Sequence, residues 1–231
     1  MSSSLNQTVF KATLPVMFGY IPLGMAFGVL FSDLGYHWLF ACAMGVFIFA
    51  GAAQFLAVGL LANQAGLLEI FITTFLLNSR HIFYGISLMS GMQARGWRRL
   101  YLIFGLTDET FSLLTSTQPP AGVDKTAYQL RVTLFDQSYW VLGCTLGGWL
   151  GSQISFSTAG IEFVLPALFM VLAIEQYRHL RKPAPFLMAL IIGLFVLLFI
   201  SRYQMLLISI LLSVAVLLLY RGGAKWNPYR I

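Results

Sequence analysis

Charge is scarce in this sequence: Asp, Glu, Lys and Arg make up 10% of its 231 residues, against roughly 25% in a typical soluble domain. Hydrophobic residues make up 58%, and the mean hydropathy is +0.80. This balance excludes an ordinary soluble domain and predicts an all-α polytopic protein of the lipid bilayer. The length leaves room for a single transmembrane domain, residues 1–231, and for few soluble appendages.

Signals for catalysis and metal binding are missing as well. The chain has two cysteines, Cys42 and Cys144, and both lie in apolar runs, which argues against a disulfide. It has no CxxC pair and no His/Cys ligand spacing, so we predict no metal site. The motifs HExxH and GxSxG and a phosphate-binding loop are absent, so we predict neither an enzyme nor a bound cofactor.

Long apolar runs predict about seven or eight spans, some of them broken or re-entrant. No small-x-small cleavage site ends the first run, which we expect to be a retained span. The run 100–115 is short and Asp108-Glu109 interrupts it, so we predict a re-entrant segment there. A loop at 118–125 divides the chain. The other predicted spans cover residues 9–31, 38–61, 67–92, 138–151, 161–174, 183–200 and 203–220.

The net charge of +6 indicates membrane topology rather than nucleic-acid binding. Most basic residues form clusters beside apolar spans, the usual mark of cytoplasmic loops. If 100–115 does not cross, all clusters face the cytoplasm and the N-terminus lies outside, which we favour. If it crosses, the N-terminus lies inside and the first cluster faces outward; both place the C-terminus in the cytoplasm. The clusters are Arg95/Arg98/Arg99, Arg178/Arg181/Lys182 and Arg221/Lys225/Arg230.

A short motif occurs twice. Tyr20-x-x-Leu23-Gly24-x-x-x-Gly28 is repeated as Tyr139-x-x-Leu142-Gly143-x-x-x-Gly147. An accidental match in a Gly-rich apolar sequence is one interpretation. The other is an internal repeat with halves 9–92 and 128–200, followed by a final span at 203–220. Transporters are often built from inverted repeats, which would make the two halves point in opposite directions.

A polar tetrapeptide, Asn78-Ser79-Arg80-His81, lies midway in the otherwise uncharged stretch 70–94. An arginine near the centre of a span costs at least ~2.5–3.5 kcal/mol on insertion scales, which predicts an interior, paired position. Asn78 and His81 share a helix face and Arg80 does not, so the helix must unwind or end near Asn78 for all three to line one cavity. The alternative is a structural pairing of Arg80, with His81 merely joining helices; a titrating role for His81 also stays open.

Three further segments are candidates for a functional site. In Gly51-Ala52-Ala53-Gln54, small residues permit close approach by a ligand or by another helix, but helix packing explains the amide of Gln54 less well. In Gly19-Tyr20-Ile21-Pro22, proline frees a carbonyl one turn earlier, or only kinks the helix. Asp108 and Glu109 could pair with Arg80, couple a cation, or cap a helix just after Thr107.

Four segments in this order resemble the AzlC-type large subunit of bacterial branched-chain amino-acid exporters. The resemblance covers about the first half strongly, while the second half matches mainly in length and hydropathy. The segments are Phe18-Gly19-Tyr20-Ile21-Pro22-Leu23-Gly24 with Phe27-Gly28, Phe49-Ala50-Gly51-Ala52-Ala53-Gln54-Phe55, Asn78-Ser79-Arg80-His81, and Thr107-Asp108-Glu109-Thr110-Phe111.

The resemblance implies a multi-pass secondary transporter of the bacterial inner membrane that exports leucine, isoleucine and valine, and often methionine. It also implies a partner, a small AzlD-type membrane subunit. A membrane scaffold whose partner holds the substrate is the alternative function. The candidate substrate-binding residues are Tyr20, Pro22, Gly51, Gln54, Asn78, Arg80 and His81, and the candidate gate or ion pair is Arg80 with Asp108 and Glu109.

Overall fold

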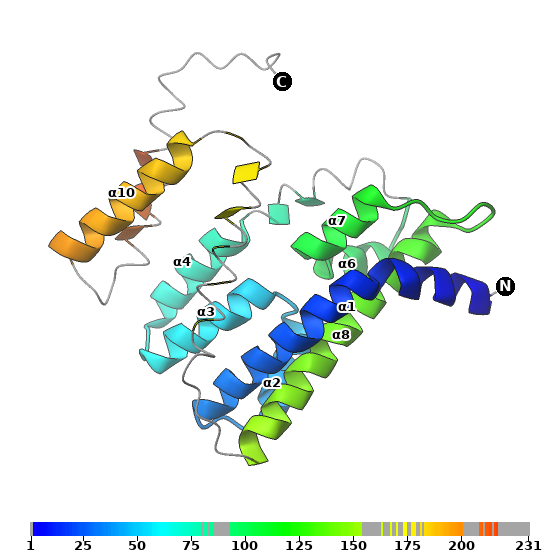
Figure 1. Ribbon diagram of the computed structural model, residues 1–231, viewed down its shortest axis with the longest axis horizontal. Helices are drawn as coiled ribbons and strands as arrows, with labels where there is room; N and C mark the ends of the chain where they lie inside the picture. Colours follow the sequence, from blue (N-terminus) through cyan, green and yellow to red (C-terminus); the bar gives the residue numbers. More distant parts are fainter. Residues whose placement is uncertain are drawn as a thin grey trace. The chain divides into compact units, whose positions relative to one another are not determined.

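The computed structural model describes residues 2–79, 81–82, 84–85, 93–153, 163, 167, 170, 173–174, 177–178, 181, 183–200, 208–209, 211–213 and 215–216. Its elements within these residues are helical, which confirms the all-α prediction. The helices are α1 (Ser2–Asp33), α2 (Trp38–Phe47), α3 (Gly51–Ala62), α4 (Leu67–Asn78), α6 (Trp97–Phe104), α7 (Asp108–Ser116), α8 (Lys125–Gln153) and α10 (Ala184–Phe199) (Figure 1).

The chain forms two compact units. The first comprises Met1–Gln64 and Leu77–Ala167, and the second Ala65–Leu76 and Leu168–Ile231. The first unit contains α1–α3 and α6–α8. The second contains α10 and most of α4. Helix α10 matches the span predicted at 183–200. The spans predicted at 161–174 and 203–220 lie largely outside the described residues.

Helix α1 is long enough to cross a bilayer. Its part from Leu5 to Asp33 has 29 residues, about 44 Å at 1.5 Å per residue, and the hydrocarbon core is about 30 Å thick. Pro15 and Pro22 lie within the helix and do not end it. Among the described residues, α1 is the one helix that has both the length and the hydropathy of a span, in agreement with the prediction for 9–31.

Helices α1 and α8 lie side by side and run in the same direction (Figure 1). In their N-terminal halves the ring centroids of Phe10 and Phe135 are 6.5 Å apart. Near their C-terminal ends the Ser32 hydroxyl donates to the carbonyl of Gly148 over 2.8 Å. The contacts therefore advance along both helices together, which establishes the parallel orientation.

Glycines of the repeated motif form the contact between α1 and α8. A Cβ on Gly24 would lie 3.0 Å from the carbonyl oxygen of Trp140, and one on Gly28 would overlap the backbone at Gly148. The two copies of the motif thus pack against each other, as small residues allow in membrane helices. An inverted repeat requires its two copies to run in opposite directions. Because α1 and α8 are parallel, they are not corresponding helices of an inverted repeat.

The segment predicted as one span at 38–61 is broken by a turn between α2 and α3. Helix α2 packs against α8 and runs opposite to it. At one end of α2, Gln137 Nε2 donates to the carbonyl of Val46 over 3.0 Å, and at the other end Trp38 lies against Gly148. Because numbers rise along α2 as they fall along α8, α2 also runs opposite to α1.

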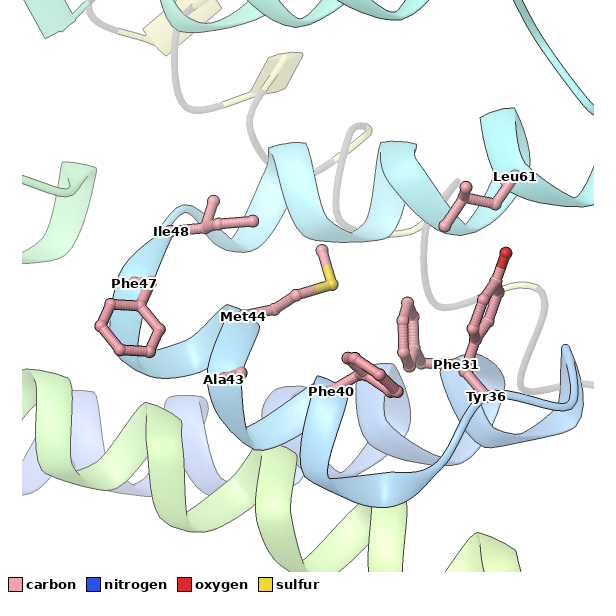
Figure 2. Close-up of a pocket in the computed structure, with 8 residues that line it drawn as sticks. All are labelled: Phe31, Tyr36, Phe40, Ala43, Met44, Phe47, Ile48 and Leu61. Carbon is pink, nitrogen blue, oxygen red and sulfur yellow. The ribbon is translucent and has the colours of Figure 1, made fainter.

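Helix α3 turns back along α1. The ring centroids of Phe49 and Tyr20 are 6.4 Å apart, and further along those of Phe55 and Phe27 are 5.8 Å apart, so α3 follows the direction of α1. Figure 2 shows the two arms and the reversal of the chain near Ile48. The arms have 10 and 12 residues, about 15 and 18 Å, and neither can cross the bilayer alone. The segment is a helical hairpin rather than the predicted single span.

The segment predicted as re-entrant at 100–115 is likewise interrupted, between α6 and α7. Thr107 caps α7, because its hydroxyl oxygen accepts a hydrogen bond from the backbone N–H of Thr110 over 3.1 Å. Asp108 and Glu109 occupy the first turn of α7, where a negative charge interacts favourably with the helix dipole. Thr107 is therefore the capping residue, and the two carboxylates directly follow it; their pairing with Arg80 stays a prediction.

Candidate functional site

Tyr20 lies midway along α1, where both interrupted segments reach it. Its hydroxyl oxygen is 2.7 Å from Thr107 Oγ1 and 2.7 Å from Glu109 Oε2. Its ring lies beside Phe49 in the hairpin turn and beside Trp140 of α8, at a centroid distance of 5.3 Å from the latter. The side chain is 5% exposed. One buried tyrosine therefore joins the turn of the α2–α3 hairpin to the N-terminus of α7.

The polar contacts continue from Tyr20 to Asp136 of α8. Thr107 Oγ1 is 3.0 Å from Thr110 Oγ1, and the Thr110 hydroxyl donates to Asp136 Oδ2 over 2.9 Å. Asp136 is fully buried, and its Oδ1 has no hydrogen-bond partner in the part of the chain that the structure describes. A carboxylate so removed from water costs free energy unless it is paired or protonated.

The sequence did not lead us to Asp136. The predicted span began at Ser138, which left Asp136 outside the membrane, whereas α8 begins at Lys125 and places it within the helix. The available signal was its spacing: Asp136 comes four residues before Trp140 and so shares the face of α8 on which Trp140 meets Tyr20.

Gln54 and Gly51 lie together at the start of α3. Gln54 is fully buried, and its Oε1 accepts hydrogen bonds from Trp140 Nε1 over 2.8 Å and from the backbone N–H of Ala50 over 3.3 Å. A Cβ on Gly51 would be 3.1 Å from the Trp140 ring. The amide oxygen of Gln54 thus ties the hairpin to α8, and its predicted contact with a substrate stays a prediction.

The turn before α3 has an unusual backbone. Phe49 has φ 45° and is 3% exposed, and a bulky residue rarely adopts this left-handed conformation. The N-cap, Ala50, makes no side-chain cap hydrogen bond to the first turn of α3. The first N–H groups of a helix have no partner within the helix, and they carry a partial positive charge. The hairpin turn therefore presents backbone donors close to Tyr20.

The predicted helix break is present, since α4 ends at Asn78. His81 Nδ1 is 3.1 Å from the carbonyl oxygen of Asn78, and its ring contacts that of Tyr84. Tyr84 stacks on Phe111 of α7 at a centroid distance of 4.6 Å. The residues after the break therefore lie beside α7, the helix that carries Glu109.

Two predicted site residues, Arg80 and Pro22, are not among the contacts around Tyr20 described above. Arg80 lies outside the described residues, so its pairing with Asp108 or Glu109 stays a prediction. Pro22 has an exposed side chain on α1, although the carbonyl it leaves unpaired belongs to the preceding turn of the helix.

An apolar cavity of about 360 Å³ lies between the arms of the hairpin (Figure 2). Apart from the hydroxyl of Tyr36, its lining side chains are apolar, so it offers little to a charged molecule. The polar contacts around Tyr20 are the better candidate site. The lining residues are Phe31, Tyr36, Phe40, Ala43, Met44, Phe47, Ile48 and Leu61.

The family model of the AzlC protein matches residues 15–154. The chain belongs to the AzlC family. The matched range contains every residue of the candidate site from Tyr20 to Asp136, and α10 lies beyond it. No solved structure gave a significant match.

Named relatives agree with membership of the AzlC family. The chain is 38% identical to the branched-chain amino acid transport protein AzlC of Bacillus subtilis, over 76% of the chain and 69% of that protein. It is 38% identical to a membrane protein of Helicobacter pylori strain J99, over 92% of the chain and 93% of the relative. It is 30% identical to the inner membrane protein YgaZ of Escherichia coli, over 79% and 77%. The chain is therefore a membrane protein homologous to a transport protein for branched-chain amino acids.

Proposed function

We propose that this chain is the large subunit of a secondary transporter that exports leucine, isoleucine, valine and methionine across the bacterial inner membrane. The relative from Bacillus subtilis, named as a branched-chain amino acid transport protein, supports the substrate class. The relative from Escherichia coli, named as an inner membrane protein, supports the location. The multi-pass topology and the cytoplasmic C-terminus belong to the same proposal.

The observation that carries the proposal is the meeting of a helix N-terminus and a carboxylate at Tyr20. An amino acid needs hydrogen-bond donors for its carboxylate and acceptors for its ammonium group. The N-terminus of α3 at Gly51, with no side-chain cap, would hold the carboxylate. Glu109, whose carboxylate lies 2.7 Å from the Tyr20 hydroxyl, would face the ammonium group.

The remaining candidates would line the path between these groups and the membrane surfaces. Asn78 is the last residue of α4, and His81 follows the break, where its ring contacts Tyr84, which stacks on Phe111 of α7. We propose that Arg80 pairs with Asp108 or Glu109 to form a gate, because an arginine at this depth is costly without a partner. Helices interrupted near the middle of the membrane are the usual substrate sites of secondary transporters.

We further propose that the chain works with a small membrane subunit of the AzlD type. Several large apolar side chains of α2 are exposed within the described residues, among them Phe40, 59% exposed, and Phe47, 78% exposed. Lipid and a partner helix could both cover such a face. Co-purification of a tagged large subunit with an untagged small subunit after co-expression tests the partner directly.

Export is tested in cells that co-express the two subunits and are loaded with a dipeptide containing leucine or methionine. Intracellular hydrolysis releases the free amino acid, and an exporter slows its accumulation. We expect a lower intracellular plateau and faster appearance of the amino acid in the medium than in cells with an empty vector. Equal accumulation in the two strains would contradict the proposed function.

The same assay separates a transporter from a scaffold whose partner holds the substrate. For Arg80→Ala, the transporter proposal predicts a complex that still co-purifies but no longer exports. A scaffold role predicts instead that Arg80→Ala abolishes co-purification. Measuring both quantities in one strain distinguishes the two functions.

A further inference from the structure

Three hydroxyl groups join the carboxylates of Glu109 and Asp136 in one unbroken chain of hydrogen bonds. The Tyr20 hydroxyl is 2.7 Å from both Glu109 Oε2 and Thr107 Oγ1. Thr107 Oγ1 is 3.0 Å from Thr110 Oγ1, and Thr110 Oγ1 is 2.9 Å from Asp136 Oδ2. All these distances are within the range of normal hydrogen bonds.

A count of hydrogen atoms shows which protonation states this chain of hydrogen bonds requires. It has four oxygen–oxygen links, and each link holds one hydrogen. Each of the three hydroxyls can donate only one hydrogen, so the hydroxyls supply three of the four. The fourth must come from a carboxyl group at one end. A complete chain therefore has either Glu109 protonated and Asp136 charged, or Asp136 protonated and Glu109 charged.

The surroundings of Asp136 favour a single proton shared between Asp136 and Glu109. Within the described residues, the titratable groups in electrostatic contact with it are Tyr20 on α1, Tyr101 on α6, Glu109 on α7 and Tyr139 on α8. None of these groups around Asp136 is a cation, and helices α2 and α3 contain no charged residue. Two charged carboxylates in such a place repel each other, and neighbouring carboxyl groups commonly share one proton for this reason. Of the two carboxylates proposed above as partners of Arg80, Asp108 is therefore assigned to the gate and Glu109 to the proton.

We propose that Glu109 and Asp136 share a single proton through Tyr20, Thr107 and Thr110, and that this proton couples the transport cycle. The inference rests on the proposed function above, whose driving ion it identifies. When the proton moves from Glu109 to Asp136, an O–H bond breaks at Glu109 and one forms at Asp136. Each hydroxyl between them gives up one proton and receives another, so all three stay neutral.

The position of the proton decides the charge that a substrate meets. Asp136 is fully buried, while Glu109 is only partly buried. Glu109 is therefore the end of the hydrogen-bond chain that is nearer to a substrate. With the proton on Asp136, Glu109 is a carboxylate that can bind an ammonium group. With the proton on Glu109, this attraction is lost. For the proton to be carried, Glu109 must take it up from water on one side of the membrane and release it to water on the other. Net transport includes this step, whereas the exchange of one leucine for another does not.

The test uses the full-length chain, co-expressed and purified with the small subunit and reconstituted into liposomes. Two quantities are measured: leucine counterflow, in which internal unlabelled leucine exchanges for external labelled leucine, and the change in lumenal pH that a leucine gradient drives, read from trapped pyranine. For the unaltered protein we expect both. For Asp136→Asn and for Thr110→Val, which removes the hydroxyl that donates to Asp136, we expect counterflow to persist and the leucine-driven pH change to be lost.

Thr13→Val is the matched control, because Thr13 is fully buried like Thr110. Thr13 Oγ1 is 3.1 Å from the Tyr139 hydroxyl, so this variant also removes a buried threonine hydroxyl, but one outside the hydrogen-bond chain between the carboxylates. We expect it to keep both counterflow and the pH change. Loss of the pH change in Thr13→Val as well would show a general packing effect and overturn the assignment to the hydrogen-bond chain.

The other outcomes are separable. Leucine counterflow without any pH change in the unaltered protein would refute the shared coupling proton and leave the transport proposal standing. No counterflow in the unaltered protein would contradict the transport proposal itself. Loss of counterflow in both Asp136→Asn and Thr110→Val would assign these residues to substrate binding or folding, and so would also overturn the proton role.

Discussion

At the scale of single residues, Trp140 does two things at once. Its indole N–H donates to Gln54 Oε1 over 2.8 Å, and its ring packs against Tyr20 and Gly51. Trp140→Phe keeps an aromatic ring but leaves the fully buried amide oxygen of Gln54 with one donor fewer. Because the N–H of Ala50 still donates to this oxygen, the loss costs about 0.5–1.5 kcal/mol. We expect a lower midpoint of thermal unfolding for the purified protein in detergent.

Trp149→Phe provides the comparison for this prediction, because Trp149 lies on the same helix and is 48% exposed. We expect its midpoint to stay close to that of the unaltered protein. If both variants shift the midpoint equally, the hydrogen bond to Gln54 does not hold the hairpin turn against α8.

The sequence indicated half of the candidate site for sound physical reasons. Glu109 is visible because the membrane penalises a charge within an apolar run, and Tyr20 because it lies in a segment with a proline inside the first span. Asp136 was missed because hydropathy averages over a window and does not locate the start of a helix. Its neighbours in the first part of α8, from Lys125 to Gln137, are mixed polar and apolar, so the apolar run seemed to begin after it.

At the scale of helices, the parallel pair of α1 and α8 depends on close approach at glycine. A methyl group on Gly28 would overlap the backbone at Gly148 and Cys144, whereas one on Gly19 in the same helix would meet nothing within 4 Å. Overpacking typically costs about 1–3 kcal/mol, and backbone atoms cannot move aside as a side chain can. We therefore expect Gly28→Ala to lower the unfolding midpoint in detergent.

Gly19→Ala is the paired control, since it makes the same chemical change in the same helix. Alanine has a higher helix propensity than glycine by about 1 kcal/mol, so we expect an unchanged or higher midpoint. A Gly28→Ala protein as stable as the Gly19→Ala protein would show that α1 and α8 do not pack at this distance.

The hairpin of α2 and α3 could not be predicted from hydropathy. Its turn, residues 48–50, is as apolar as its arms, so the run 38–61 has the length and composition of one span. The turn depends on Phe49 in a left-handed conformation, which no residue preference would suggest. In contrast, the cap at Thr107 was predictable, because threonine before two acidic residues is a common helix start.

At the scale of the whole molecule, the directions of the helices constrain the topology. The hairpin returns the chain to the side from which it came, so the loops 34–37 and 63–66 lie on one side of the membrane. Because α8 runs parallel to α1, the loop 118–124 lies on the opposite side, together with the N-terminus. Between residues 66 and 118 the chain must then cross an odd number of times, and the run 67–92 has the length for one crossing.

This arrangement moves the N-terminus and the loop 34–37 to the opposite sides from those favoured from the sequence, which counted 38–61 as a crossing. The loops 34–37 and 63–66 contain no lysine or arginine, whereas Lys11, Lys125 and Arg131 all lie toward the N-terminal ends of the two parallel helices. Positive charge marks the cytoplasmic side. We therefore expect the N-terminus and the loop 118–124 in the cytoplasm, and the ends of the hairpin at the outer face.

Single cysteines measure this sidedness in a chain whose Cys42 and Cys144 are replaced by alanine. We expect an impermeant maleimide added to intact cells to label Tyr36→Cys and Ala62→Cys, and to label Ala121→Cys only after permeabilisation. Labelling of Tyr36→Cys and Ala62→Cys from opposite sides would mean that 38–61 crosses the membrane as one span. Labelling of Tyr36→Cys and Ala121→Cys from the same side would mean that α1 and α8 cross in opposite directions. The reversal of the chain between α2 and α3 is the physical reason for not expecting the first result, and the parallel packing of the glycines of α1 and α8 is the reason for not expecting the second.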